Sequence, residues 1–245
     1  MKPWLLVLAW VLSPGLALAQ NDAKALLDQA LAALRGPPMA AELELAIERP
    51  GRRATYRLSI YSGGQDRSLV RVRDPARMKG QAFLISRNRI WVYDPRFRRV
   101  LELPPSGKSQ SFLGSDLSFE DLAGRGFARD YSVKIGRASG DRVTLVLIPR
   151  PNAPVPYGRL ELTLKAATKV PLELVYYDQR GQAVRRVRFT ERAALGEGRY
   201  LITAGEVENL QRPGWRTRFR FTAFKPLDRV DPACFTPTAL ERGCP

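Results

Sequence analysis

After residue 41 this 245-residue chain changes to a pattern in which apolar and polar side chains alternate with a period of two. Residues 42–48 read Glu-Leu-Glu-Leu-Ala-Ile-Glu, and residues 55–60 read Thr-Tyr-Arg-Leu-Ser-Ile. Such alternation is typical of antiparallel strands that bury one face and expose the other to water. Similar segments follow at about 67–73, 81–86, 89–94, 97–103, 130–136, 142–149, 157–166, 170–178, 183–192, 199–209 and 215–224. The pattern predicts about a dozen strands in one sheet, and a sheet of this size must curl.

Helical patterns occupy two short parts of the chain. Residues 22–35 place Leu27, Leu31 and Leu34 on one face at helical spacing, with Asp22 as the expected N-cap. A Gly-Pro-Pro sequence stops this helix. Helices are therefore too few to cover both faces of the sheet, and we expect them to fill its concave face and to leave an apolar ligand cavity there.

The second helix is expected after a loop at residues 104–116. Ser115 or Ser118 can cap it, and Ser118 and Asp121 have the spacing of a capping box. Gly124 and Gly126 are expected to end it. Since the chain shows no linker and no repeat, the prediction is one α+β domain over residues 20–230, followed by a tail at 231–245.

The first 19 residues have the features of a secretory signal peptide. Lys2 is the positive start, Trp4–Leu12 is the apolar stretch, and Ala-Leu-Ala at 17–19 is a small-x-small cleavage site. The apolar stretch is too short for a membrane span. No cysteine follows the predicted cut, so we expect an exported, periplasmic protein that is not itself a lipoprotein.

The basic charge of the chain comes mainly from arginine. Lys and Arg number 40 against 24 Asp and Glu, a net charge of +16, and loss of Lys2 with the signal peptide leaves +15. The arginines could reflect composition alone, spread over solvated strand faces, or they could steer the protein toward anionic lipid or another envelope polymer. Export argues against nucleic acid as the partner.

Histidine is missing from the sequence, and this excludes several chemistries. Neither a Ser-His-Asp or Cys-His nucleophile nor a His-ligated zinc or haem site can be built, and we expect no cofactor and no metal. Cys234 and Cys244 are the two cysteines. In an exported chain such a pair favours one disulfide, here a clasp on the C-terminal tail.

Several motifs together resemble a known family. They are Met-Lys-Gly-x-x-Phe-Leu at 78–84, Trp-x-Tyr-x-Pro at 91–95 and Ser-Phe-x-Gly-Ser-Asp-x-Ser-x-x-Asp-Leu at 111–122, with Val-Pro-Tyr at 155–157 and Tyr-Asp-x-x-Gly at 177–181. The chain resembles the outer-membrane lipoprotein-sorting proteins, relatives of the periplasmic lipoprotein carrier LolA, over nearly its whole mature length.

The resemblance implies a half-open β-barrel with a helical lid, which carries the acyl chains of lipoproteins or another envelope lipid in an apolar cavity. It also implies an inner-membrane donor complex, an outer-membrane acceptor and a peripheral encounter with the membrane. The expected cavity-wall residues are Phe83, Trp91, Tyr93 and Phe112. The expected lid residues are Leu27, Leu31, Leu34, Phe119 and Leu122, and the expected turn and capping residues are Gly114, Ser115, Asp116, Ser118 and Asp121.

Two other classes of function stay open at this point. A lipid-sensing or scaffold protein of the envelope would bind a protein partner. An enzyme would need a carboxylate pair, and Asp116 and Glu120 have helical i, i+4 spacing, although capping explains these acids more simply. The sequence favours the carrier and predicts no enzyme.

Overall fold

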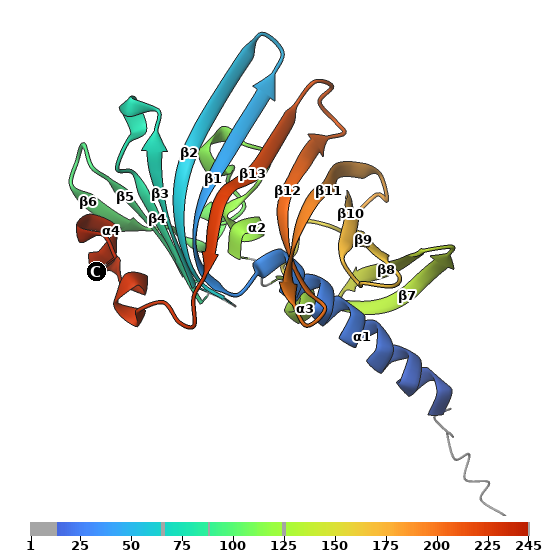
Figure 1. The fold of residues 1–245 in the computed structure, drawn as a ribbon. Helices are drawn as coiled ribbons and strands as arrows, with labels where there is room; N and C mark the ends of the chain where they lie inside the picture. The colour runs from blue at the N-terminus through green and yellow to red at the C-terminus, as the bar shows by residue number, and fades with distance from the viewer. Residues whose placement is uncertain (1–13, 65–66, 88, 124–125, 245) are drawn as a thin grey trace, which may run out of the picture.

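The computed structural model describes residues 14–64, 67–87, 89–123 and 126–244. Thirteen strands of these residues form one antiparallel sheet in the order β6-β5-β4-β3-β2-β1-β13-β12-β11-β10-β9-β8-β7. The strands are β1 (Pro38–Arg49), β2 (Arg52–Gly63), β3 (Arg67–Asp74), β4 (Ala82–Ser86), β5 (Arg89–Asp94), β6 (Arg99–Glu102), β7 (Tyr131–Ser139), β8 (Arg142–Pro149), β9 (Arg159–Lys165), β10 (Pro171–Tyr177), β11 (Ala183–Gly196), β12 (Arg199–Asn209) and β13 (Arg216–Pro226). The sheet curls without closing, which confirms the predicted half-open barrel (Figure 1).

The strand order follows the chain except around one connection. Strand β6 forms one edge of the sheet, whereas the next strand in the chain, β7, forms the opposite edge. The residues between them, 103–130, therefore have to cross from edge to edge, and we call them the crossing segment. They contain η2 (Pro105–Gly107), η3 (Phe112–Gly114), α2 (Phe119–Ala123) and α3 (Gly126–Asp130). Helix α2 ends at Ala123, just before the two glycines predicted to end it; Gly126 begins α3, and Gly124 lies outside the described residues.

The N-terminal helix α1 (Pro14–Arg35) packs against β7, β10 and β12. Its Leu27 and Leu31 are buried. The predicted N-cap at Asp22 is wrong, because the helix begins at Pro14 and continues through this position. Lys2 and Trp4–Leu12 lie outside the described residues, so the signal peptide stays a prediction. Among the described helices, none is long and apolar enough to cross a membrane.

Two hydrophobic clusters cover the concave face. The first joins α1 to β7–β12, and its buried centre includes Leu145, Leu160 and Leu164. The second joins β1–β5 to the crossing segment and includes Leu45 and Leu58. Each strand supplies alternate side chains to these clusters, as the period of two requires.

A third cluster lies on the opposite, convex face, where the C-terminal residues pack. They form η4 (Pro232–Phe235) and α4 (Pro237–Arg242), and Cys234 and Leu240 are fully buried against β3 and β4. The guanidinium of Arg71 on β3 donates hydrogen bonds to two carbonyl oxygens of α4, at 3.0 and 3.1 Å. A disulfide joins Cys234 to Cys244, which confirms the predicted pairing. The expectation that the helices fill only the concave face is wrong for α4, because this tail helix covers the convex one.

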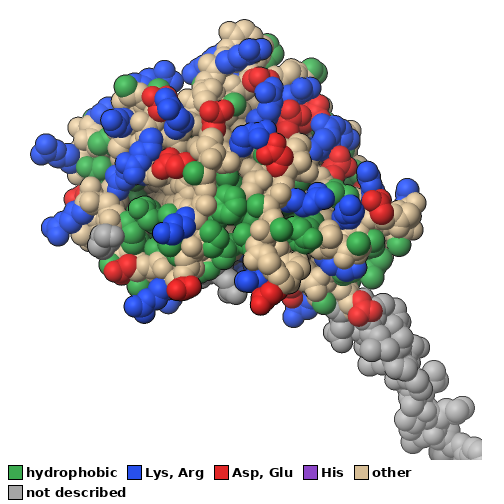
Figure 2. All heavy atoms as spheres, in the orientation of Figure 1, with side chains coloured by type: hydrophobic (Ala, Val, Ile, Leu, Met, Phe, Trp, Pro, Cys, Tyr) green, Lys and Arg blue, Asp and Glu red, His purple; other side chains and the backbone are tan. Residues whose placement is uncertain are grey.

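Arginine and glutamate side chains pair across strands on the convex face. Arg188 lies within 4 Å of carboxylate oxygens on both neighbouring strands, 3.8 Å from Glu173 and 3.6 Å from Glu206. Arg218 bridges Glu48 and Glu206 at 2.7 and 3.3 Å. Figure 2 shows such basic and acidic side chains mixed over the upper part of the face in view. Exposed pairs contribute about 0–1 kcal/mol each, so these arginines serve mainly to solvate the outer surface.

Candidate functional site

An apolar cavity of about 260 Å³ lies on the concave face between the first two clusters. Its walls come from the end of α1, from β1–β4, from β10–β13 and from the crossing segment. Leu31 and Val187 line it from the first cluster, and Leu45, Leu58 and Phe112 line it from the second. The two halves of the sheet thus bury their apolar faces separately and leave a space where they meet.

The crossing segment closes one side of this cavity with aromatic and aliphatic side chains. Phe112 and Phe119 pack on Phe83 of β4, with ring centroids 4.9 and 5.6 Å from that of Phe83. Leu117 and Leu122 of the same segment line the cavity itself and are only half-buried. The closure is therefore a hydrophobic contact between a short irregular segment and the inner face of the sheet.

Asp121 ties the crossing segment to the far half of the sheet. Its carboxylate accepts hydrogen bonds from the backbone N–H and the hydroxyl of Ser118, at 2.7 and 2.8 Å, and the Ser118 hydroxyl accepts one from the Asp121 N–H. This confirms the predicted capping box. The same carboxylate accepts two hydrogen bonds from Arg185 of β11, at 2.7 and 2.8 Å. A capping residue thus also forms a buried ion pair.

Arg185 keeps the buried Asp121 carboxyl in its charged form. Burial alone would raise the pKa of Asp121, but the charge of Arg185 and the hydrogen bonds from Arg185 and Ser118 outweigh it and lower this pKa below its ordinary value. Arg185 is buried over the ring of Tyr176, with its guanidinium carbon 3.7 Å from the ring centroid. Burial raises the pKa of Tyr176, so its hydroxyl stays neutral.

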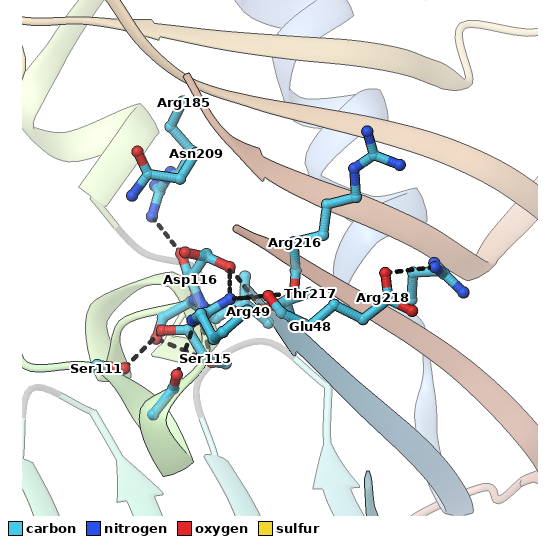
Figure 3. Close-up of polar contacts among 12 residues, drawn as sticks. Glu48, Arg49, Ser111, Ser115, Asp116, Arg185, Asn209, Arg216, Thr217 and Arg218 are labelled. Atoms are coloured by element: carbon cyan, nitrogen blue, oxygen red, sulfur yellow. Dashed lines mark hydrogen bonds and ion pairs between the residues drawn. The ribbon is translucent and has the colours of Figure 1, made fainter. Parts of the chain in front are cut away.

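Asp116 anchors the same segment to the seam between β1 and β13. Its carboxylate accepts hydrogen bonds from Arg49 at 2.9 Å and from the Thr217 hydroxyl at 2.8 Å, and its N–H donates to that hydroxyl at 3.0 Å (Figure 3). Arg49 also donates to the Gly114 carbonyl at 2.8 Å. Gly114 has φ +78°, which favours glycine at this turn. Ser115 is buried, and its hydroxyl accepts a hydrogen bond from the Leu117 N–H at 3.1 Å.

The structure separates the four predicted wall residues. Phe112 lines the cavity, and Phe83 lies directly behind it on the concave face. Trp91 and Tyr93 share one face of β5, as their spacing requires, but they pack against the C-terminal residues on the convex face. Their assignment to the cavity wall is wrong, because Ile90 and Val92 are the residues of β5 that face the concave cluster.

Three of the five predicted lid residues line the cavity. Leu31, Leu34 and Leu122 line the cavity, whereas Leu27 is buried between α1 and the sheet. Phe119 is buried in the aromatic contact with Phe83. Whether any of them moves aside for a ligand remains a prediction.

Arg49 and Arg185 are the site residues that the sequence did not reveal. Each holds one acid of the crossing segment, and the two contacts span 67 and 64 residues of chain. With 32 arginines in the sequence, no local signal distinguishes these two. Arg185 stands among several arginines of one strand segment, and only the fold shows that its side chain is buried.

The described residues line the cavity with apolar side chains and a few polar groups, and they form no cluster of metal ligands. In the part of the chain that the structure covers, no three Asp, Glu or Cys side chains gather closely enough to hold a metal ion. The polar groups that line the cavity include Arg35, Arg67 and two serines. This chemistry suits an apolar ligand with a polar end.

Solved structures with the same architecture define the class of protein. A protein described as an outer membrane lipoprotein-sorting protein domain, from Vibrio parahaemolyticus, has a TM-score of 0.79 at 21% identity, over 91% of this chain and 100% of that one. A DUF1329 family protein from Desulfovibrio piger has a TM-score of 0.79 at 23% identity, over 91% and 99%. A LolA superfamily protein from Nitrosomonas europaea has a TM-score of 0.70 at 25% identity, over 87% and 97%.

These likenesses confirm the predicted resemblance: the chain has the LolA-like, half-open barrel fold with an apolar cavity. It belongs to a protein family described as "Uncharacterized protein", whose model matches residues 64–242. The comparison with curated proteins gives no match.

Proposed function

We propose that this protein is a non-enzymatic carrier of the cell envelope, which binds the acyl chains of lipoproteins, or of another envelope lipid, in the cavity between its two hydrophobic clusters. The observation that carries the proposal is the cavity itself, which is apolar and sits between two halves of one sheet. The LolA-like fold supports it. The similar protein from Vibrio parahaemolyticus is described as a lipoprotein-sorting protein domain, and the one from Nitrosomonas europaea is described as a LolA superfamily protein.

The physics of carriage sets how much of an acyl chain the protein must shield from water. Each acyl CH₂ left in water costs about 0.8 kcal/mol, so a carrier must shield most of the chain. The empty cavity of about 260 Å³ is smaller than the roughly 300–1,000 Å³ of ordinary small-molecule sites. We therefore propose that the crossing segment or α1 moves outward when a long acyl chain is loaded.

The balance between closure and loading lies in the contacts of the crossing segment. Its hydrophobic side chains fill space that cargo would occupy, and Asp116 and Asp121 hold it to the sheet. A very stable closed state would weaken cargo binding by the opening free energy. We propose that Leu122 and Phe119 yield to lipid while the two acids guide the segment back.

The proposed location is the periplasm. The predicted signal peptide over residues 1–19 would export the chain, and the disulfide between Cys234 and Cys244 agrees with an oxidising compartment. The proposed partners are a donor complex at the inner membrane and an acceptor at the outer membrane.

The test is native mass spectrometry of the purified protein with extraction of bound lipid, followed by titration with a fluorescent fatty acid. We expect acyl lipid to co-purify and the fatty acid to displace it. Ile60→Trp places a large ring in the cavity wall and should reduce binding, whereas Ile148→Trp changes an exposed residue of β8 and should not.

The outcomes separate the carrier from its main alternative. A protein that is repeatedly empty, ignores the fatty acid and binds only a protein partner would be an envelope scaffold. Equal loss of binding in Ile60→Trp and Ile148→Trp would show that the cavity is not the binding site.

A further inference from the structure

The two most exposed large hydrophobic side chains of the described residues lie at one edge of the sheet. Phe97, in the turn between β5 and β6, is 68% exposed, and Leu101, on the edge strand β6, is 63% exposed. Ile135 and Ile148 follow at 41% and 38%, and they lie on β7 and β8 at the opposite edge. Two strongly exposed apolar side chains in one short stretch of chain call for an explanation.

Basic residues flank Phe97 of this pair. The β5–β6 turn, residues 94–99, contains Arg96, Arg98 and Arg99 around Phe97, with one acid, Asp94. Asp94 accepts hydrogen bonds from Arg96, at 3.0 and 2.6 Å. Figure 2 shows basic side chains projecting from the side of the molecule where Figure 1 places β5 and β6.

The neighbouring β3–β4 turn, residues 75–80, adds to the same charge. It contains Arg77 and Lys79, both exposed, and no acid. The two turns touch, because a methyl group on Gly80 would lie 3.6 Å from the Cγ atom of Pro95. We call residues 75–80 and 94–101 the basic edge. Its combination of arginines with a protruding phenylalanine and leucine fits the headgroup region of an anionic bilayer.

The strand register links this edge to the cavity. Val70, which lines the cavity, pairs with Phe83, Phe83 pairs with Val92, and Val92 pairs with Leu101. Directly paired residues of antiparallel strands share a face, so these four side chains form one apolar row on the concave face. The row runs from the cavity wall to the exposed rim.

We propose that the basic edge docks the protein on anionic membranes, with Phe97 and Leu101 inserted among the lipids and the arginines at the headgroups. This places the outer end of the apolar row at the bilayer, where an acyl chain could enter. Self-pairing of β6 with a second copy is less favoured, since this strand has four residues and carries an arginine, features that protect edges. The docking goes beyond the proposed function and does not require the cavity to hold cargo.

Vesicle co-sedimentation tests the proposal. The protein should bind vesicles of phosphatidylglycerol mixed with phosphatidylcholine far more tightly than vesicles of phosphatidylcholine alone. Arg96→Gln/Arg98→Gln/Arg99→Gln should weaken binding about a hundredfold, because each basic residue near an anionic surface contributes about fivefold. Phe97→Ser/Leu101→Ser should weaken it about tenfold or more.

Matched variants at the opposite edge serve as controls. Ile135→Ser/Ile148→Ser removes two exposed hydrophobic side chains, and Arg137→Gln/Arg142→Gln removes two exposed basic ones, without touching the basic edge. Both should bind anionic vesicles like the unchanged protein. A dye on Phe97→Cys should shift to the emission of an apolar environment when anionic vesicles are added.

Three results would overturn the proposal: no preference for anionic vesicles, equal losses in the controls, or a dye that reports no change. A dimer that Phe97→Ser/Leu101→Ser converts to monomer would assign the edge to a second copy instead. Fatty-acid binding should be normal in all these variants. If the unchanged protein did not bind the fatty acid, this result would count against the carrier function and not against docking.

Discussion

Asp121 of α2 and Arg185 of β11 form a two-point ion pair that joins the crossing segment to the sheet, with N–O distances of 2.7 and 2.8 Å. Both side chains are largely withdrawn from water, at 15% and 10% exposure. Breaking one partner of such a pair leaves an uncompensated charge, whereas removing both does not. The pair therefore controls how firmly the crossing segment is held.

Arg185→Ala should lower the free energy of unfolding by about 3–5 kcal/mol, because it strands the Asp121 carboxylate. The double variant Asp121→Ala/Arg185→Ala should lose less than this. Arg186→Ala is the matched control, since this neighbour lies 3.4 Å from Glu173 on the outer face and should cost about 1 kcal/mol or less. Urea denaturation measures all three. Equal losses for Arg185 and Arg186 would contradict the importance of the buried pair.

Stability should depend on pH through the same carboxyl. The folded protein lowers the pKa of Asp121 from its ordinary value near 3.8, so the charged form favours folding. This contribution is complete above that ordinary value and is lost as pH falls through the lower folded pKa. Asp121→Asn should flatten the acid side of the unfolding profile below about pH 4. An unchanged acid slope in this variant would show that other carboxyls dominate.

Leu122→Ala should affect binding more than stability. Its side chain is half-buried and lines the cavity, so truncation enlarges the space and weakens closure. The free energy of unfolding should fall by less than the roughly 2–5 kcal/mol of a core truncation, and fatty-acid affinity should rise. Leu145→Ala, at a fully buried position of β8, should lose the full amount and gain no affinity. If both variants behave alike, α2 is ordinary core and not a lid.

Thr217→Val should loosen the second attachment of the crossing segment. The Thr217 hydroxyl is fully buried and makes two hydrogen bonds with Asp116, and valine of the same shape leaves both groups without them. We expect a loss of about 1–3 kcal/mol in the free energy of unfolding. Thr163→Val, which removes one contact to Thr144 at 3.1 Å, should lose less. Thermal melts of the two variants provide the comparison.

Cys234→Ser/Cys244→Ser should release the C-terminal residues and leave the concave face intact. The bridge closes a ten-residue separation, for which loop entropy predicts roughly 2–3 kcal/mol. Limited proteolysis should then cut around α4, while fatty-acid binding stays unchanged. Loss of fatty-acid binding in this variant would show that the convex cluster supports the cavity.

Strands β1 and β2 could be predicted because their apolar and polar side chains alternate cleanly. The expected segments 89–94, 142–149 and 199–209 coincide with β5, β8 and β12. The face that each residue of β5 presents could not be predicted, because Ile90, Trp91, Val92 and Tyr93 are all apolar. Both faces of this strand are covered, and alternation carries no information where polar residues are missing.

The contacts that attach the crossing segment to the sheet could be predicted only where both partners are close in sequence. The capping box of Ser118 and Asp121 is local, and its spacing was sufficient to predict it. The partners Arg49 and Arg185 come from distant strands, and their burial follows from the curl of the sheet and not from their neighbours in sequence. The burial of the C-terminal residues on the convex face likewise depends on a long-range contact, with β3 and β4.

The pairing of β1 with β13 also sets the order in which this protein can fold. Leu43 pairs with Phe221, so the two strands at the centre of the sheet come from opposite ends of the chain. Closing so long a loop is slow, because its entropy must be lost before the contact is made. During synthesis β1 can pair with β2 but must wait, with an open edge, until β13, the last of the described strands, has emerged. A chain cut short before β13 would expose that edge to aggregation and to proteases, so only full-length molecules would survive to do their work.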